Sequence, residues 1–219
     1  MDGNGRWAKE RGLVRMRGHK EGANAARRII NYCVEKKISS LTLWAFGIEN
    51  WGRPRLEVRY LMELFYRALN NNLKAINQNK IKLQVIGRRD NLEPKLISII
   101  NKVENATRDN SGLKLNIAFN YSGKWDVLNA TRQIVRANID PDAIDENMFR
   151  SFLSLPDQVD PDLFIRTSGE LRLSNFLLWQ LAYTEFYFTE TYWPDFDETG
   201  LEKAISEFNS RDRRFGRVK

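Results

Sequence analysis

Apolar positions recur every three or four residues in several stretches of the chain, which is the spacing that places side chains on one face of a helix. The period is clear over residues 20–36, and it runs again from Leu56 to about Gln78. Residues 7–10 have the composition of a first helical turn. The pattern predicts helices over residues 7–10, 20–36, 56–78, 93–108, 124–137, 146–153 and 199–210.

Short apolar runs alternate with these helices and are typical of buried strands. They cover residues 39–46, 81–86, 113–119, 162–166 and 185–188. Strands that alternate with helices over the whole length indicate an α/β fold, with a mainly parallel central sheet flanked by helices. Because no low-complexity segment or Pro/Ser-rich linker divides the chain, we expect residues 1–219 to form a single domain.

Polar loops that contain glycine follow three of the predicted strands, at residues 50–54, 120–123 and 166–170. Ligands of open α/β sheets bind beyond the carboxyl ends of the strands, so these loops are candidates for one site. Residues 1–7 have the same character. Their glycines leave backbone N–H groups free to face an anion, Asp2 can hold a cation, and Arg6 can pair with a phosphate. The stretch indicates a diphosphate site, although Asp-Gly-Asn-Gly also occurs as an ordinary turn.

The charge of the chain narrows the range of partners. Its formal net charge is +7, and a basic surface attracts nucleic acid, anionic membranes or phosphorylated small molecules. The arginines gather in separate groups rather than in one long stripe, which favours discrete phosphate pockets over a nucleic-acid surface. Cys33 is the single cysteine, so we expect no disulfide framework and a cytoplasmic location. The sequence shows neither an apolar run of membrane-span length nor a secretory signal pattern.

Several longer motifs follow one another in order over nearly the whole chain. They are Met-Asp-Gly-Asn-Gly-Arg-Trp-Ala at residues 1–8, Gly-His-Lys-Glu-Gly at 18–22, Glu-Asn-Trp-Gly-Arg-Pro at 49–54, Asn-Tyr-Ser-Gly at 120–123, Arg-Thr-Ser-Gly-Glu at 166–170, Arg-Leu-Ser-Asn-Phe-Leu-Leu-Trp-Gln at 172–180 and Trp-Pro-Asp-Phe at 193–196. In these motifs the chain resembles the cis-prenyltransferases, or Z-prenyl diphosphate synthases, and among them the bacterial undecaprenyl diphosphate synthases.

The resemblance implies a transferase that condenses isopentenyl diphosphate units onto an allylic diphosphate such as farnesyl diphosphate, with Z geometry and Mg²⁺. The long polyprenyl diphosphate product, undecaprenyl diphosphate, would be a carrier lipid for bacterial cell-wall synthesis. A homodimer, an apolar tunnel walled by the helix from Leu56, and peripheral contact with the inner face of the membrane are also implied, and nucleic-acid binding is not. Three alternatives stay open: a short- or medium-chain Z-prenyl synthase, a non-catalytic regulatory subunit of a prenyltransferase and, on the basic charge alone, a nucleic-acid binder.

The family's functional residues carry over position by position. Asp2 and Asn50 are the catalytic candidates, although an amide is a poor base and diphosphate is the alternative proton acceptor. Asp2 and Glu185 are the candidate Mg²⁺ ligands. The substrate-binding candidates are Gly3, Asn4, Gly5, Arg6, Trp7, Arg15 and His19 near the allylic diphosphate, Arg166, Arg172 and Ser174 near the isopentenyl diphosphate, Trp51, Arg53 and Glu57 on a mobile loop and helix start, and Arg214 and Gly216 in a tail that would reach the partner's site.

Two positions and one missing segment depart from the family's pattern. Gly47 stands where many bacterial members have a serine or threonine, and Leu171 stands where some have a histidine that assists metal binding. Neither change removes a diphosphate anchor, so we expect an active enzyme in which any change concerns magnesium dependence. Family members also carry an apolar strand directly before the Asp-Gly-Asn-Gly stretch. That first strand is missing from this sequence, and we expect the natural protein to carry one before Asp2.

Overall fold

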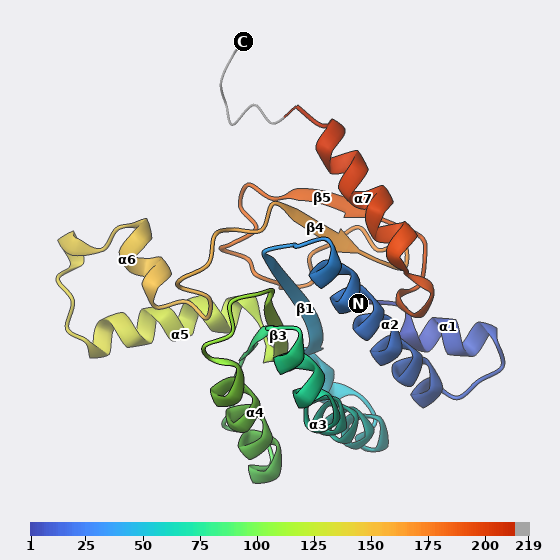
Figure 1. Ribbon diagram of the computed structural model, residues 1–219. Coiled ribbons are helices and arrows are strands. Elements are labelled where there is room, and N and C mark those ends of the chain that lie inside the picture. Colours follow the sequence, from blue (N-terminus) through green and yellow to red (C-terminus); the bar gives the residue numbers. More distant parts are fainter. Residues whose placement is uncertain (213–219) are drawn as a thin grey trace.

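The computed structural model describes residues 1–212, and every predicted helix and strand is present among them (Figure 1). The largest shift at an element's end is at the second helix, which begins at Arg15 rather than at residue 20. No helix in this part of the chain is long and apolar enough to cross a membrane. The helices are α1 (Asn4–Glu10), α2 (Arg15–Glu35), α3 (Arg55–Gln78), α4 (Pro94–Thr107), α5 (Gly123–Arg136), α6 (Glu146–Ser151) and α7 (Glu198–Ser210), and the strands are β1 (Ser40–Gly47), β2 (Lys82–Ile86), β3 (Lys114–Tyr121), β4 (Leu163–Arg166) and β5 (Glu185–Phe188).

All strand pairs are parallel, which confirms the α/β fold. The described strands form two groups, a three-stranded sheet in the order β1-β3-β2 and the pair β4-β5. In Figure 1, α3 and α4 lie below the three-stranded sheet, α7 lies beside β4 and β5, and α5 with α6 extends away from α1. The strand expected before Asp2 stays a prediction, because the described residues begin at Met1.

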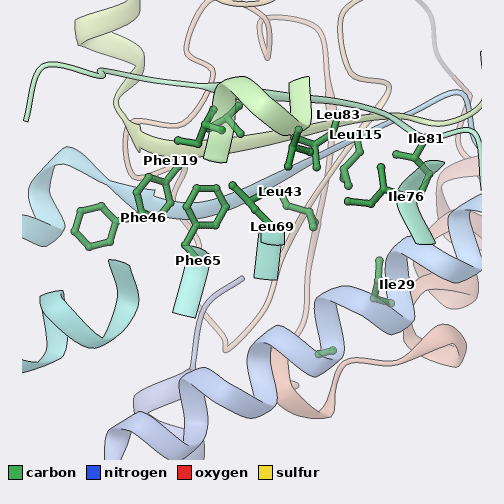
Figure 2. Packing of buried hydrophobic residues seen from close by; sticks show 14 of the residues in the cluster. Ile29, Leu43, Phe46, Phe65, Leu69, Ile76, Ile81, Leu83, Leu115 and Phe119 are labelled. Carbon is green, nitrogen blue, oxygen red and sulfur yellow. The ribbon is translucent and has the colours of Figure 1, made fainter. Parts of the chain in front are cut away.

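The apolar face of α3 packs directly on β1 and β3 (Figure 2). The Phe65 ring stacks on Phe119 with ring centroids 4.0 Å apart, and Phe46 lies 5.4 Å from Phe119. Leu69 continues the same stripe and is 2% exposed. Full burial of each such side chain contributes about 1.5–3 kcal/mol. This packing fixes the carboxyl ends of β1 and β3, where two of the polar loops begin.

Two glycines on α2 explain how α1 is held. A Cβ atom at Gly18 would lie 1.9 Å from the Asn4 carbonyl oxygen, and one at Gly22 would lie 2.2 Å from Asn4 Oδ1. Residues with side chains at these positions would push α1 away. The glycines of the Gly-His-Lys-Glu-Gly motif therefore let the backbone of α1 rest against α2, and this contact positions residues 2–6.

Candidate active site

A cavity of about 1420 Å³ lies between α2, β1, β4 and α7. It is larger than the roughly 300–1,000 Å³ of ordinary small-molecule sites. The lining is charged and polar beyond the strand ends and at the helix starts, and it is apolar along the helix faces. The charged and polar lining residues beyond the strand ends include Asp2, Asn4, Arg6, Arg15, His19, Asn50, Arg53, Arg166 and Ser174, and the apolar ones include Ile29, Cys33, Leu41, Leu43, Leu61, Ile165, Trp193, Phe196, Leu201, Ile205 and Phe208.

The apolar wall differs from the expected tunnel. We expected the helix from Leu56 to wall it, but of α3 only Leu61 is among the lining residues in the described part of the chain. The rest of that helix's apolar stripe is already packed on the sheet, as at Phe65. The wall comes instead from α2, α7, β1 and β4.

Asp2 is fixed beside the carboxyl end of β4. Its backbone N–H donates to Thr167 Oγ1 at 3.0 Å, and its carboxylate accepts hydrogen bonds from Gly3 N at 2.7 Å and from Arg166 Nη2 at 2.9 Å. Burial opposes ionisation, but the Arg166 and Gly3 hydrogen bonds prevail and hold the pKa of Asp2 below its usual value. The side chain is still 39% exposed. Asp2 is thus an ionised carboxylate that faces the cavity.

Gly3 permits this arrangement in two ways. Its φ of 98° lies in the left-handed region that favours glycine. A Cβ atom there would also lie 2.6 Å from Tyr192 Cδ1 and 2.9 Å from Ser168 Cβ. The first glycine of the Asp-Gly-Asn-Gly stretch is therefore required by the close approach of two other segments.

Three arginines and two carboxylates form one network, which we name the Asp2 cluster. Arg166 is 11% exposed and joins Asp2 to Ser174, whose Oγ accepts from Nη1 at 2.9 Å. Glu170 pairs with Arg6 at 3.0 Å and also with Arg172, so it bridges residues assigned to two different diphosphates. Sequence reasoning missed Glu170, although it ends the Arg-Thr-Ser-Gly-Glu motif. The members of the Asp2 cluster are Asp2, Arg6, Arg166, Glu170 and Arg172.

A second network, the Glu57 cluster, comprises Arg15, His19, Arg53 and Glu57. The Glu57 carboxylate is 8% exposed and accepts from Arg15 Nε at 3.1 Å, Arg53 Nη1 at 3.3 Å and His19 Nε2 at 3.0 Å. Burial would raise the pKa of Glu57, but the His19 and Arg15 hydrogen bonds lower it. Burial lowers the pKa of His19 despite Glu57, so His19 is neutral at pH 7 and donates its Nε2–H. Glu57 thus organises the groups that face the cavity.

The two networks meet at Gly5. A Cβ atom on Gly5 would lie 3.0 Å from the guanidinium carbon of Arg15, so the missing side chain lets Arg15 come close to the Asp-Gly-Asn-Gly stretch. Trp7 points elsewhere. Its Nε1–H donates to Asp195 Oδ1 at 2.6 Å, and its ring lies under the Arg11 guanidinium, 4.5 Å from the ring centroid. The structure therefore places Trp7 as an anchor of α1.

The loop after β1 is tied down by its own side chains. Asn50 Oδ1 accepts from Gly47 N at 3.0 Å within the turn of residues 48–52. Trp51 donates from Nε1 to Asn120 Oδ1 at 2.8 Å and packs its ring on Phe46. Sequence reasoning flagged the Asn120 loop but gave that residue no role. Its φ of 54° is the structural signal of a constrained position at the end of β3.

Glu185 is separated from Asp2 within the chain. It pairs with Leu163 at the start of β4 and forms an ion pair with Arg211 at 2.9 Å. Asp2 contacts the other end of β4, about 10 Å further along at roughly 3.3 Å per residue. Among residues 1–212, no three His, Cys, Asp or Glu side chains gather as a metal cluster. Arg214 and Gly216 lie outside the described residues.

The two positions that depart from the family's pattern, Gly47 and Leu171, have different surroundings. A Cβ atom at Gly47 would lie 2.7 Å from Trp44 Cζ2, so Trp44 fills the space that a serine or threonine would need. Leu171 is 74% exposed. Gly47 is therefore matched to a neighbour in this chain, whereas Leu171 has no such constraint.

An α/β fold, a cavity that is apolar along its helix faces, and arginines and an ionised carboxylate beyond the strand ends match what is expected of a prenyltransferase that handles diphosphates. The chain belongs to the family described as "Putative undecaprenyl diphosphate synthase", which matches residues 1–216. It is 50% identical over 222 residues to the ditrans,polycis-undecaprenyl-diphosphate synthase ((2E,6E)-farnesyl-diphosphate specific) of Legionella pneumophila (strain Paris), and the match covers 100% of this chain and 93% of that protein.

Two solved structures are similar over most of their length. The lavandulyl diphosphate synthase of Lavandula x intermedia, in complex with dimethylallyl diphosphate, has 36% identity and a TM-score of 0.94, with 99% of this chain and 95% of that chain covered. The "probable undecaprenyl diphosphate synthase" of Campylobacter jejuni has 34% identity and a TM-score of 0.82, with 90% and 93% covered. Both likenesses agree with the family and with the fold described above.

Proposed function

We propose that this protein condenses isopentenyl diphosphate units with Z geometry onto farnesyl diphosphate and makes undecaprenyl diphosphate, the carrier lipid of bacterial cell-wall synthesis. The observation that carries the proposal is the cavity, which combines a charged region with an extended apolar wall in one volume of about 1420 Å³. That combination suits a diphosphate on a long apolar chain. The Legionella pneumophila relative, named as farnesyl-diphosphate specific, supports the choice of starter.

The reaction builds negative charge on the leaving diphosphate and positive charge on the allylic carbon. Fixed cationic groups at the diphosphate stabilise that charge as it develops. We assign the allylic diphosphate to Gly3, Asn4, Gly5, Arg6, Arg15 and His19, and the isopentenyl diphosphate to Arg166, Arg172 and Ser174. Glu170 pairs with Arg6 and Arg172, one from each set, so the two diphosphates would bind side by side. Such placement makes the two carbons meet in a defined geometry.

Asp2 fits a magnesium ligand. It is ionised and half-exposed, and Mg²⁺ in phosphate sites prefers one or two carboxylates together with phosphate oxygens and waters. When bound, Mg²⁺ neutralises charge on the diphosphate. Glu185 remains a second candidate ligand. Within one chain it lies about 10 Å from the Asp2 end of β4, at roughly 3.3 Å per residue. We propose that the protein is a homodimer in which Arg214 and Gly216 reach the partner's site.

Asn50 positions its loop in this proposal. Its Oδ1 accepts from Gly47 N at 3.0 Å, and an amide oxygen so engaged is a poor base. The proton released at each condensation would then pass to a diphosphate oxygen. We also propose that the protein works in the cytoplasm, with its apolar product delivered at the inner face of the membrane.

Incubation with farnesyl diphosphate, labelled isopentenyl diphosphate and Mg²⁺, followed by product sizing, tests the function. We expect a long polyprenyl product. Absence of incorporation by folded protein would refute the enzyme and favour a regulatory subunit. That alternative predicts the loss of anchors such as Asp2 and Arg166, whereas both are present in the sequence. A short product would favour the short- or medium-chain alternative, for which the likeness to lavandulyl diphosphate synthase is the specific observation.

A further inference from the structure

The junction of α1 and α2 is exposed at every position from residue 9 to residue 17. Three apolar side chains face water there: Leu13 is 42% exposed, Val14 67% and Met16 40%. Basic residues alternate with them. Single exposed apolar side chains are ordinary on a protein surface, but several together indicate a surface that meets a partner.

The start of α3 extends this surface. Arg15 on α2 and Glu57 on α3 pair at 3.1 Å, so the beginnings of the two helices are side by side. Leu56, the neighbour of Glu57 in the chain, is 75% exposed. We name as the α2–α3 patch the apolar residues Leu13, Val14, Met16 and Leu56 together with the exposed basic residues Arg17, Lys20, Arg55 and Arg59.

The charges of the α2–α3 patch are of one sign. Within residues 1–212, no ion pair involves Arg17, Lys20, Arg55 or Arg59. Three acidic residues lie nearby: Glu10 accepts from the Tyr192 hydroxyl, Glu21 accepts from Asn24, and Glu57 is buried. Basic residues of the same segments outnumber them, so the surface is positively charged as a whole. A second copy placed symmetrically on this surface would bring like charges together, which opposes self-association. The partner must therefore be anionic and also accept apolar side chains.

We propose that the α2–α3 patch docks on an anionic lipid bilayer. Apolar side chains flanked by Lys and Arg are suited to the boundary between headgroups and acyl chains. Each basic residue near an anionic surface strengthens binding about fivefold. Docking would set Arg15, His19 and Arg53, which line the cavity, close to the lipid surface. This benefit rests on the proposed function, because an amphipathic diphosphate would then enter from the membrane.

Vesicle co-sedimentation without substrate tests the docking separately from the reaction. The wild type should bind vesicles of phosphatidylglycerol and phosphatidylcholine much more tightly than phosphatidylcholine alone. Val14 is the N-cap of α2, and aspartate is a favoured N-cap, so Val14→Asp removes the apolar group while the helix start is kept. We expect Val14→Asp to lower vesicle partition by about tenfold or more. Arg17→Gln with Arg55→Gln should lower it by about 25-fold at low salt.

The matched control is Val135→Asp. Val135 is 72% exposed on α5, which extends away from the α1–α2 junction in Figure 1. Its variant should bind vesicles like the wild type. Unchanged binding of Val14→Asp, or an equal loss in Val135→Asp, would overturn the proposal, and so would a dimer that Val14→Asp dissociates. Incorporation of isopentenyl diphosphate from a vesicle-free solution should be unchanged in Val14→Asp. Vesicle binding by a chain that incorporates nothing would refute the proposed function and leave the docking intact.

Discussion

The Asp2 cluster and the Glu57 cluster both hold arginines at the cavity, but their carboxylates are placed differently. The Asp2 side chain is 39% exposed and Glu170 is 23% exposed, whereas Glu57 is 8% exposed. Asp2 and Glu170 belong to loops next to β4. Glu57 lies in the first turn of α3 and accepts from three side chains at once.

This difference in exposure separates carboxylates that a substrate can replace from one that only holds its neighbours in place. Arg6, Arg166 and Arg172 are paired with carboxylates that water can reach, so an incoming diphosphate can exchange for those carboxylates at little cost. A diphosphate cannot replace the buried Glu57 carboxylate in this way. An unpaired carboxylate in its position would be costly, and so would the loss of its negative charge among Arg15, Arg53 and His19. Changes in the Asp2 cluster should alter kinetics first, whereas a change at Glu57 itself should alter stability first.

The largest effect is expected for Asp2→Ala. It removes the candidate metal ligand and the partner of Arg166, so turnover should fall about a thousandfold, or roughly 4 kcal/mol in the barrier. Binding of the allylic diphosphate should weaken far less, because the arginines remain. Steady-state rates at saturating Mg²⁺ and equilibrium binding of farnesyl diphosphate measure the two effects. An unchanged rate would remove Asp2 from the metal role.

Glu57→Ala should have the larger effect on folding. Glu57 and His19 are buried but Arg15 is 61% exposed, so loss of the charged hydrogen bonds should cost about 1.5–3 kcal/mol. Glu57→Gln, which keeps the shape and one acceptor, should cost less. Urea denaturation followed by circular dichroism measures both. Asp2→Ala serves as the comparison and should lose about 1 kcal/mol or less, since its carboxylate is half-exposed. Equal losses in the two variants would contradict the distinction between the clusters.

The sequence predicted the elements well because their patterns are local. Periodicity located α3 within one residue, and the loops after β1, β3 and β4 do meet beyond the strand ends. The division into two sheets was not visible, since pairing depends on contacts between distant segments.

The candidate site was predicted in composition but not in connectivity. Sequence motifs placed Asp2, Arg166 and Ser174 together, and the structure joins them by hydrogen bonds. The bridging role of Glu170, the anchoring of Trp51 on Asn120 and the burial of Glu57 arise from tertiary packing. A charged residue in a motif looks the same whether it will face a ligand or hold its neighbours.

Arg172→Ala tests whether the exposed arginines of the Asp2 cluster bind substrate. Arg172 is 60% exposed, so its pair with Glu170 should contribute about 1 kcal/mol or less to stability. The KM for isopentenyl diphosphate should rise about tenfold to a hundredfold through loss of a charged phosphate contact. Arg67→Ala is the control, because Arg67 is 68% exposed and pairs with Glu63 on α3. A rise in KM for both variants would point to a general charge effect.

The smallest expected effect is a pH dependence of folding that arises from His19. Its pKa is lowered in the folded protein, chiefly by burial, so the unfolded chain takes up a proton first as pH falls below the usual value of 6.5. The contribution of His19 to the free energy of unfolding is therefore fully present above pH 6.5, and it decreases as the pH falls through the folded pKa. Glu57 opposes the burial effect and keeps the decrease small. The pKa values of Asp2 and Glu57 are also lowered, so their contributions to stability are lost only at lower pH, below their usual pKa values of 3.8 and 4.5.

His19→Gln isolates this contribution, because His19 is the only histidine in the sequence and glutamine can still donate to Glu57. Urea midpoints between pH 7.5 and pH 5 should fall more steeply for the wild type than for the variant. Parallel curves would mean that His19 keeps its ordinary pKa.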